Sequence, residues 1–188
     1  APPGLTFVVV SDDAKEKMKN RKTPIASFYA NLMAFDGYYE KKWFPYTMPI
    51  SDIYGLRAAF NLIAGDKTLY ERHARIGSAT RAAVKEAGLK LHLQSGYSNT
   101  VTVFDIPECT DAKSILDEMR TKYNIMLAGS FDELSGKVIR IGHMGENARL
   151  EHMVPALEAL SATLTDLGVT LQGNLADLFL KHYREFQD

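Results

Sequence analysis

Arg140 lies inside an apolar run, VIRIG, that otherwise has the composition of a buried strand. Alternate side chains of a strand point to opposite faces, so Ile139 and Ile141 should face the core. Val138, Arg140 and Gly142 then share the opposite face. If that face meets solvent, Arg140 is a surface charge. If it lines a cleft, the planar fork of donors is suited to hold a carboxylate through two hydrogen bonds, and Gly142 leaves room for a ligand.

No other group of residues points as clearly to chemistry. The five histidines form no HExxH pattern, and the single cysteine, Cys109, offers neither a CxxC metal motif nor an internal disulfide. No G-x-S-x-G motif marks a hydrolase nucleophile. The segment GHMGEN, residues 142–147, joins a strand to a helix but matches neither phosphate-loop fingerprint. A tight turn with Asn147 as helix N-cap is the favoured interpretation.

The overall composition is that of an ordinary globular protein. Hydrophobic residues make up 46% of the chain, and 22 basic residues nearly balance 23 acidic ones, for a formal net charge of −1. This balance argues against nucleic acid or an anionic membrane as the main partner. The apolar runs are too short to span a bilayer, and no signal-peptide pattern is present. A cytoplasmic location is therefore expected.

The elements that must position Arg140 follow from hydrophobic periodicity and turn signals. A buried strand is predicted at residues 5–10, and Ser11 should cap a short helix ending near Asn20. A helix should follow Pro49, and another should run from Lys67 to Ala87, where Gly88 stops it. The remaining prediction alternates strands with helices: strands at 89–93, 100–106, 125–128 and 137–142, and helices at 111–123, 147–167 and 174–186. This order predicts a layer of helices on one sheet.

Residues 21–49 have no regular period but are rich in aromatic side chains. They hold eight of the 19 aromatic residues of the chain. Aromatic side chains that gather outside regular structure are typical of an interface or a pocket wall. They also anchor long loops to a core, and the sequence leaves both interpretations open.

Five segments in this order resemble the carboxyl-terminal part of class V (fold type I) pyridoxal-phosphate aminotransferases, and are most similar to the serine–pyruvate and alanine–glyoxylate type. The segments are APPGLTFVVVSDDAKEKM, YTMPISDIYGLRAAFNLI, ERHARIGSATRAAVKEAGLKL, NTVTVFDIP and YNIMLAGSFDELSGKVIRIGHMG. They lie within residues 1–165, and the resemblance assigns no role to residues 166–188.

The resemblance implies an α/β protein of two parts. Residues 1–65 would be the end of a large cofactor domain with an interdomain helix. Residues 66–188 would be an α+β small domain, with helices on one face of a mainly antiparallel sheet and an extra C-terminal helix. The implied activity is that of a homodimeric transferase that uses pyridoxal 5′-phosphate. It would move an amino group between alanine or serine and a 2-oxo acid, pyruvate or glyoxylate.

Roles for individual residues also follow from the resemblance. The arginine of the family's K-x-x-R-I-G segment grips the substrate's α-carboxylate, so Arg140 would bind the amino acid or 2-oxo acid. The family's Tyr-x-x-Thr-x-Pro segment reaches the cofactor phosphate held by the other subunit, and Thr47 matches its threonine. Phe44 replaces the tyrosine, and Tyr46 could supply the missing hydroxyl.

The family's Schiff-base lysine lies just upstream of the APPG segment, so its place would precede Ala1, and no lysine of this chain matches it. The resemblance therefore assigns no catalytic residue to this chain. We expect the chain alone to be inactive and its intact parent to be the enzyme, with the abrupt start at Ala1 indicating truncation.

Alternatives to this interpretation remain open. One is a 2-aminoethylphosphonate or pyridoxamine transaminase, or a pyridoxal-phosphate lyase of the same fold. Others are a non-catalytic anion-binding module and a dimerisation module.

Overall fold

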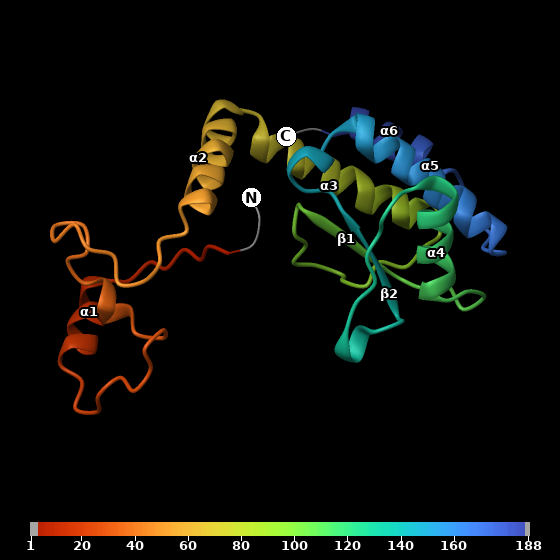
Figure 1. Ribbon diagram of the computed structural model, residues 1–188. Coiled ribbons are helices and arrows are strands. Elements are labelled where there is room, and N and C mark those ends of the chain that lie inside the picture. The colour runs from red at the N-terminus through yellow and green to blue at the C-terminus, as the bar shows by residue number, and fades with distance from the viewer. Residues whose placement is uncertain (1–3, 187–188) are drawn as a thin grey trace. The chain divides into compact units, whose positions relative to one another are not determined.

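A computed structural model describes residues 4–186 of the protein, which divide after Asp66 into two compact units. The first unit contains helix α1 (Asp12–Lys19), the short 3-10 helix η1 (Leu32–Phe35) and helix α2 (Ile50–Gly65) (Figure 1). As predicted, Ser11 caps α1, and its Oγ accepts a hydrogen bond from the Ala14 amide at 3.2 Å. The predicted helix after Pro49 is also confirmed.

The prediction of a buried strand at residues 5–10 is wrong for this structure. The segment forms no strand with any described residue, and its large side chains are exposed, Phe7 by 68% and Val9 by 98%. The apolar, β-branched composition favours a strand, but a strand needs a neighbour to pair its backbone groups. None of residues 4–186 provides one.

The aromatic segment of the first unit forms a cluster of ring contacts. Tyr46 lies at its centre, with its ring 5.4 Å from Phe28, 5.3 Å from Tyr29 and 5.5 Å from Phe35 between centroids. Phe28 and Tyr29 remain largely exposed even so. The rings therefore stabilise one another and the loop that carries them, and the cluster leaves a broad aromatic surface uncovered.

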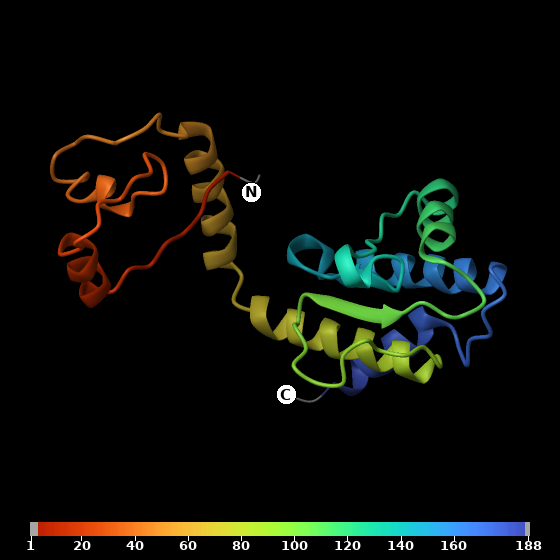
Figure 2. The same ribbon diagram turned by 90° about the horizontal axis from the view of Figure 1, so that it is seen from below.

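The second unit holds a complete hydrophobic core. Its helices are α3 (Leu69–Glu86), α4 (Ala112–Tyr123), α5 (Leu150–Asp166) and α6 (Leu175–Glu185), and its strands are β1 (Val101–Asp105) and β2 (Val138–Gly142). Two 3-10 turns, η2 (Asp132–Leu134) and η3 (Gly145–Asn147), flank β2. Phe104, Ile139 and Ile141 on the strands share one buried cluster with side chains of all four helices. The helices thus lie on one face of the strands (Figure 2).

The sheet of the second unit is small and antiparallel. Residues of β1 and β2 pair from Val101 with Gly142 to Asp105 with Val138. Single antiparallel bridges extend the ladder on both sides, Leu91 with Phe104 and Ala128 with Arg140. The fold class expected from the sequence is confirmed. The strands predicted at 89–93 and 125–128 shrink to these single bridges, at Leu91 and Ala128.

The predicted N-cap of α5 is wrong. Asn147 ends the turn η3, and the helix begins three residues later at Leu150, with Arg149 in the cap position and no side-chain capping bond. Ala148 between them is fully buried. Burial of Ala148 is a tertiary contact, and it separates the turn from the start of the helix. A prediction based on local capping preference could not include it. No helix within residues 4–186 is long and apolar enough to cross a membrane.

Helix α6 is capped by Asn174, whose Oδ1 accepts hydrogen bonds from the amides of Ala176 at 2.8 Å and Asp177 at 3.3 Å. We expect Asn174→Ala to lower the free energy of unfolding of the second unit by about 1 kcal/mol, since two helix-end donors lose their acceptor. Urea unfolding followed by circular dichroism measures this. Asn174→Asp keeps a capping oxygen and should retain most of the stability. Equal losses in both variants would contradict the capping role.

Candidate carboxylate site around Arg140

Arg140 is held in the middle of the ladder by its backbone. It faces Val103 across the β1–β2 pair. On the other side its amide donates to the Ala128 carbonyl at 2.7 Å, and the Ala128 amide donates back to the Arg140 carbonyl at 3.3 Å. The Cα of Arg140 is therefore fixed by neighbours on both sides, which makes it a well-defined base for a functional side chain.

The side chain of Arg140 lies on the face opposite the core, as the alternation predicted. Ile139 and Ile141 are buried in the core cluster, whereas Arg140 is half-buried. Its Nε donates to the carbonyl oxygen of Gly129 at 2.5 Å, and its Cζ lies 5.3 Å from the ring centroid of Phe131. Within residues 4–186, Nη1 and Nη2 have no hydrogen-bond partner. The guanidinium is thus anchored at one end and free at the other.

The face around Arg140 is covered at one end and open at the other. Val138 shares this face but is only 1% exposed. Gly142 and Ala128 are exposed and small. A Cβ on Gly142 would meet only Cε of Met144, at 3.8 Å. The strand surface is therefore open at Gly142, as expected from the sequence.

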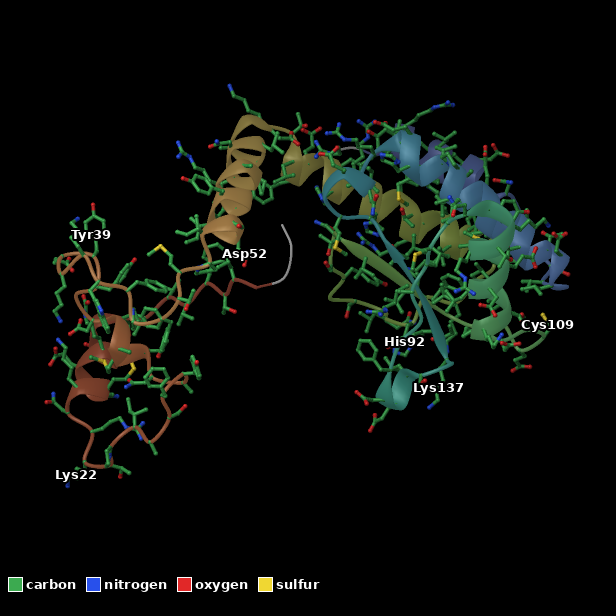
Figure 3. The ribbon with its side chains drawn as sticks, viewed as in Figure 1. Lys22, Tyr39, Asp52, His92, Cys109 and Lys137 are labelled. Carbon is green, nitrogen blue, oxygen red and sulfur yellow. The ribbon has the colours of Figure 1, made fainter. Side chains whose placement is uncertain are left out.

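A carboxylate on the same face is already neutralised. Asp105 pairs with Lys90 at 2.7 Å and with Nδ1 of His92 at 2.8 Å (Figure 3 labels His92). The Lys90 hydrogen bond, followed by that of His92, holds the pKa of Asp105 below its usual value. Because Asp105 is engaged by the Lys90 ammonium and the His92 ring, it does not pair with Arg140. The positive charge of Arg140 remains available for an external anion.

The connection that leaves β2 is fixed by two histidines. His143 is fully buried, with Nδ1 3.1 Å from the Asn99 carbonyl oxygen and Nε2 2.9 Å from Oγ1 of Thr102. Nδ1 donates to the carbonyl oxygen, and because the ring is neutral at neutral pH, Nε2 accepts from the threonine hydroxyl. Burial lowers the pKa of His143 to about 4. His73 of α3 holds the same connection, since its Nε2 accepts from the Gly145 amide at 3.0 Å.

The two residues expected to contact a cofactor phosphate lie in the first unit. Thr47 is exposed, just before α2, and its hydroxyl has no hydrogen-bond partner in the described part of the chain. The Tyr46 hydroxyl donates to the Phe28 carbonyl at 2.6 Å. Tyr46 therefore could supply a second phosphate donor only by giving up that bond. Thr47 retains the chemistry expected of it, and Phe44 contributes a ring but no hydroxyl.

The expected place of the Schiff-base lysine, just before Ala1, is not tested by the structure, because Ala1 itself lies outside the described residues 4–186. The first lysine of the sequence, Lys15, pairs with Asp36 at 2.6 Å, and its hydrogen bond to this carboxylate raises the pKa of Lys15. A lysine must lose its proton before it can attack a carbonyl, so this pairing is unfavourable for Schiff-base chemistry. The absence of a catalytic lysine from this chain stays a prediction.

Metal chemistry has no visible basis in the described residues. No three histidine, cysteine, aspartate or glutamate side chains within residues 4–186 gather closely enough to hold an ion. Cys109 is exposed and unpaired.

Sequence reasoning missed Gly129, Phe131, His73 and His143 as parts of the site. Of these four residues, Gly129 and Phe131 contact the Arg140 side chain. They lie in a loop whose sequence has no hydrophobic period, so sequence reasoning had no signal for them.

Comparison with known proteins yields several aminotransferases, although no family model matches the chain. The chain is 36% identical over 172 residues to an uncharacterised aminotransferase of Methanocaldococcus jannaschii. This alignment covers 89% of this chain and 44% of that protein. It is 35% identical to serine–glyoxylate aminotransferase of Arabidopsis thaliana, over 97% of this chain and 47% of the relative. The chain thus spans about half the length of these relatives.

A solved structure supports the same relationship. Pyridoxamine–pyruvate aminotransferase from Mesorhizobium loti matches with a TM-score of 0.83 and 31% identity, over 94% of this chain and 46% of that one. At this identity, the agreement of sequence and fold indicates common ancestry.

The buried neutral His143 should make stability depend on pH. The unfolded state binds a proton to this residue below about pH 6.5, whereas the folded state does so only near pH 4. Stability present above pH 6.5 is therefore lost as the pH falls toward 4, by up to about 1.4 kcal/mol per pH unit. Urea unfolding at several pH values measures this slope. His143→Gln should flatten it, and an unchanged slope in that variant would contradict the assignment.

Proposed function

Since this chain is homologous to the class V, fold type I, pyridoxal-phosphate-dependent aminotransferases, we propose that it is the carboxyl-terminal part of such an enzyme. The intact parent would move an amino group between a small amino acid, alanine or serine, and a 2-oxo acid, pyruvate or glyoxylate. Residues 1–65 would belong to its large cofactor domain and residues 66–188 to its small domain. Inactivity of this chain alone and a cytoplasmic location of the parent remain predictions.

The observation that carries the proposal is the state of Arg140. Its guanidinium is anchored through Nε to the Gly129 carbonyl, and Nη1 and Nη2 have no hydrogen-bond partner within residues 4–186. A fixed arginine fork holds a carboxylate in one orientation, which lowers the entropic cost of reaching the reactive geometry. The two relatives with named substrates act on glyoxylate and pyruvate, which are both 2-oxo acids. Arg140 would bind the carboxylate that these acids share.

Pyridoxal 5′-phosphate would supply the electron sink that makes the amino acid's Cα–H acidic. From this chain, Thr47 suits a contact with the cofactor phosphate because its hydroxyl is exposed and lacks a partner in the described residues. Tyr46 is less suited to contact the phosphate, because its hydroxyl already donates a hydrogen bond to the backbone carbonyl of Phe28. The exposed aromatic cluster around Tyr46 supports placing the homodimer contact on the first unit.

A pyridoxamine transaminase is the second candidate. The observation in its favour is the similarity to pyridoxamine–pyruvate aminotransferase. Arg140 would then bind only the 2-oxo acid, because pyridoxamine carries no carboxylate. Assay of the intact parent with alanine, serine and pyridoxamine as amino donors separates the two candidates.

Removal of the Arg140 guanidinium should weaken acid binding in the intact parent. We expect Arg140→Ala to raise the KM for the 2-oxo acid roughly 10- to 100-fold, because two charge-assisted hydrogen bonds are lost. Arg140→Lys should recover only part of the loss, since lysine is a point charge. Arg120→Ala is the matched control, because Arg120 pairs with Asp117 on the surface of α4 at 3.1 Å. Kinetics of Arg140→Ala equal to those of Arg120→Ala would refute the carboxylate role.

Loss of the Thr47 hydroxyl should weaken cofactor retention in the intact parent. We expect Thr47→Ala to raise the dissociation constant for pyridoxal 5′-phosphate about 10-fold, the effect of one hydrogen bond to a charged group. Equilibrium dialysis with absorbance detection measures it. Thr47→Ser keeps a hydroxyl and should bind nearly as tightly as the unchanged protein. Equal affinity in all three proteins would remove Thr47 from the phosphate site.

A further inference from the structure

The loop between the Ala128 bridge and β2 touches the Arg140 side chain at two points. One contact is a hydrogen bond, from Nε of Arg140 to the Gly129 carbonyl oxygen at 2.5 Å. The other is the ring of Phe131, whose centroid lies 5.3 Å from Cζ of Arg140. Both contacts come from residues 9 to 11 positions upstream in the chain, brought back by the antiparallel bridge between Ala128 and Arg140.

Phe131 is one of the large apolar side chains of the second unit that remain exposed. Its side chain is 69% exposed and belongs neither to the core cluster nor to its partly buried surroundings. Within residues 4–186, Arg140 is the one aromatic or cationic partner of its ring. Exposing a phenyl ring to water is unfavourable, so the ring contributes nothing evident to folding. Its contact with the guanidinium is its one evident role.

The loop that carries Phe131 is held by its own backbone bonds. The Leu134 amide donates to the Phe131 carbonyl at 3.2 Å, the Ser135 amide to the Asp132 carbonyl at 3.1 Å, and the Lys137 amide to the Leu134 carbonyl at 3.1 Å. Asp132, next to Phe131, has φ of +52°, a conformation that aspartate adopts more readily than most residues. The ring is thus presented to Arg140 by an ordered turn.

These contacts restrict how the guanidinium can bind an anion. A guanidinium can hold a carboxylate side-on, through Nε and one Nη, or end-on, through Nη1 and Nη2. The Nε–H group already donates its hydrogen bond to the Gly129 carbonyl oxygen, so it is not available for side-on binding of a carboxylate. Cζ of Arg140 lies over the Phe131 ring, and this contact limits the rotation of the guanidinium. The end-on fork is the one that remains free among the described residues.

We propose that Phe131 is a positioning residue for Arg140 and that, together with the Gly129 carbonyl, it restricts Arg140 to end-on binding of the 2-oxo acid carboxylate. The inference rests on the proposed carboxylate role of Arg140 and adds its geometry. The ring and the carbonyl hold the fork before the acid arrives, so the acid does not have to order a flexible side chain.

Side-chain NMR of the 188-residue chain tests both parts without cofactor or turnover. The Arg140 Nε–Hε resonance is assigned by its absence in Arg140→Lys. In the free chain we expect this proton to exchange slowly with water and to carry a ring-current shift from Phe131. Titration with sodium pyruvate should then shift the Nη signals while the Nε–Hε signal moves little, because Nε stays bonded to Gly129.

Variants of Phe131 test the positioning role. We expect Phe131→Leu to abolish the ring-current shift and to weaken pyruvate binding about three-fold, the effect of losing one partly exposed cation–π contact. Phe131→Tyr keeps an aromatic ring and should restore both the shift and the affinity. Tyr70→Leu is the matched control, since Tyr70 of α3 is 86% exposed and has no cation–π contact within residues 4–186. It should leave pyruvate binding unchanged.

The outcomes separate the inference from the proposed function. If Arg140→Lys binds pyruvate as tightly as the unchanged chain, or if the unchanged chain gives no response to pyruvate, the carboxylate role of Arg140 is wrong. If Arg140 is required but its Nε–Hε signal shifts most, binding is side-on and the end-on geometry is overturned. If Phe131→Leu matches the unchanged chain in ring-current shift and affinity, Phe131 does not position Arg140.

Discussion

The candidate site depends on the antiparallel ladder that places β2 between β1 and the bridge residue Ala128. This pairing fixes the backbone of Arg140 on both sides. It also sets which side chains share the Arg140 face, because pairing register and side-chain direction are coupled in a sheet. A slip of one residue would turn Arg140 into the core and Ile141 out of it. The burial of Ile139 and Ile141 against the helices therefore helps to hold the arginine in position.

Charge on the Arg140 face is arranged so that one cation remains unpaired among the described residues. Lys90 and His92 engage Asp105, the acidic residue of β1 on that face. The histidine that follows β2 is buried and neutral, and it adds no charge near the strand. A bound carboxylate at Arg140 would then have neither a competing internal carboxylate nor a second strong cation from the β2 connection. The site is therefore defined more by the fixed orientation of the Arg140 guanidinium than by the total positive charge around it.

Much of the second unit could be predicted from the sequence because its elements bury their own apolar faces. The sequence period of the helix that became α5 predicts one face made of Leu150, Met153, Val154, Leu157, Leu160 and Leu164. Four of these are buried in the core, and Leu150 and Val154 pack against it partly buried. The alternation in β2 placed Arg140 on the opposite face from Ile139 and Ile141. The loop contacts of Gly129 and Phe131 could not be predicted in the same way. They depend on the bridge between Ala128 and Arg140, which is a tertiary pairing with no local periodic signal.

The first unit was harder to predict because its apolar groups are not matched within it. The strand-like residues Phe7 to Val10 have no pairing partner among the described residues. Apolar spacing predicts one face of α2 made of Ile53, Leu56, Phe60 and Ile63, but Leu56 is only partly buried and the other three are exposed. Periodicity identifies which face of an element is apolar, but burial requires a second surface to cover it. In the second unit that surface is present in the same chain. In the first unit the pattern and the exposure disagree, because no described residue covers these apolar side chains.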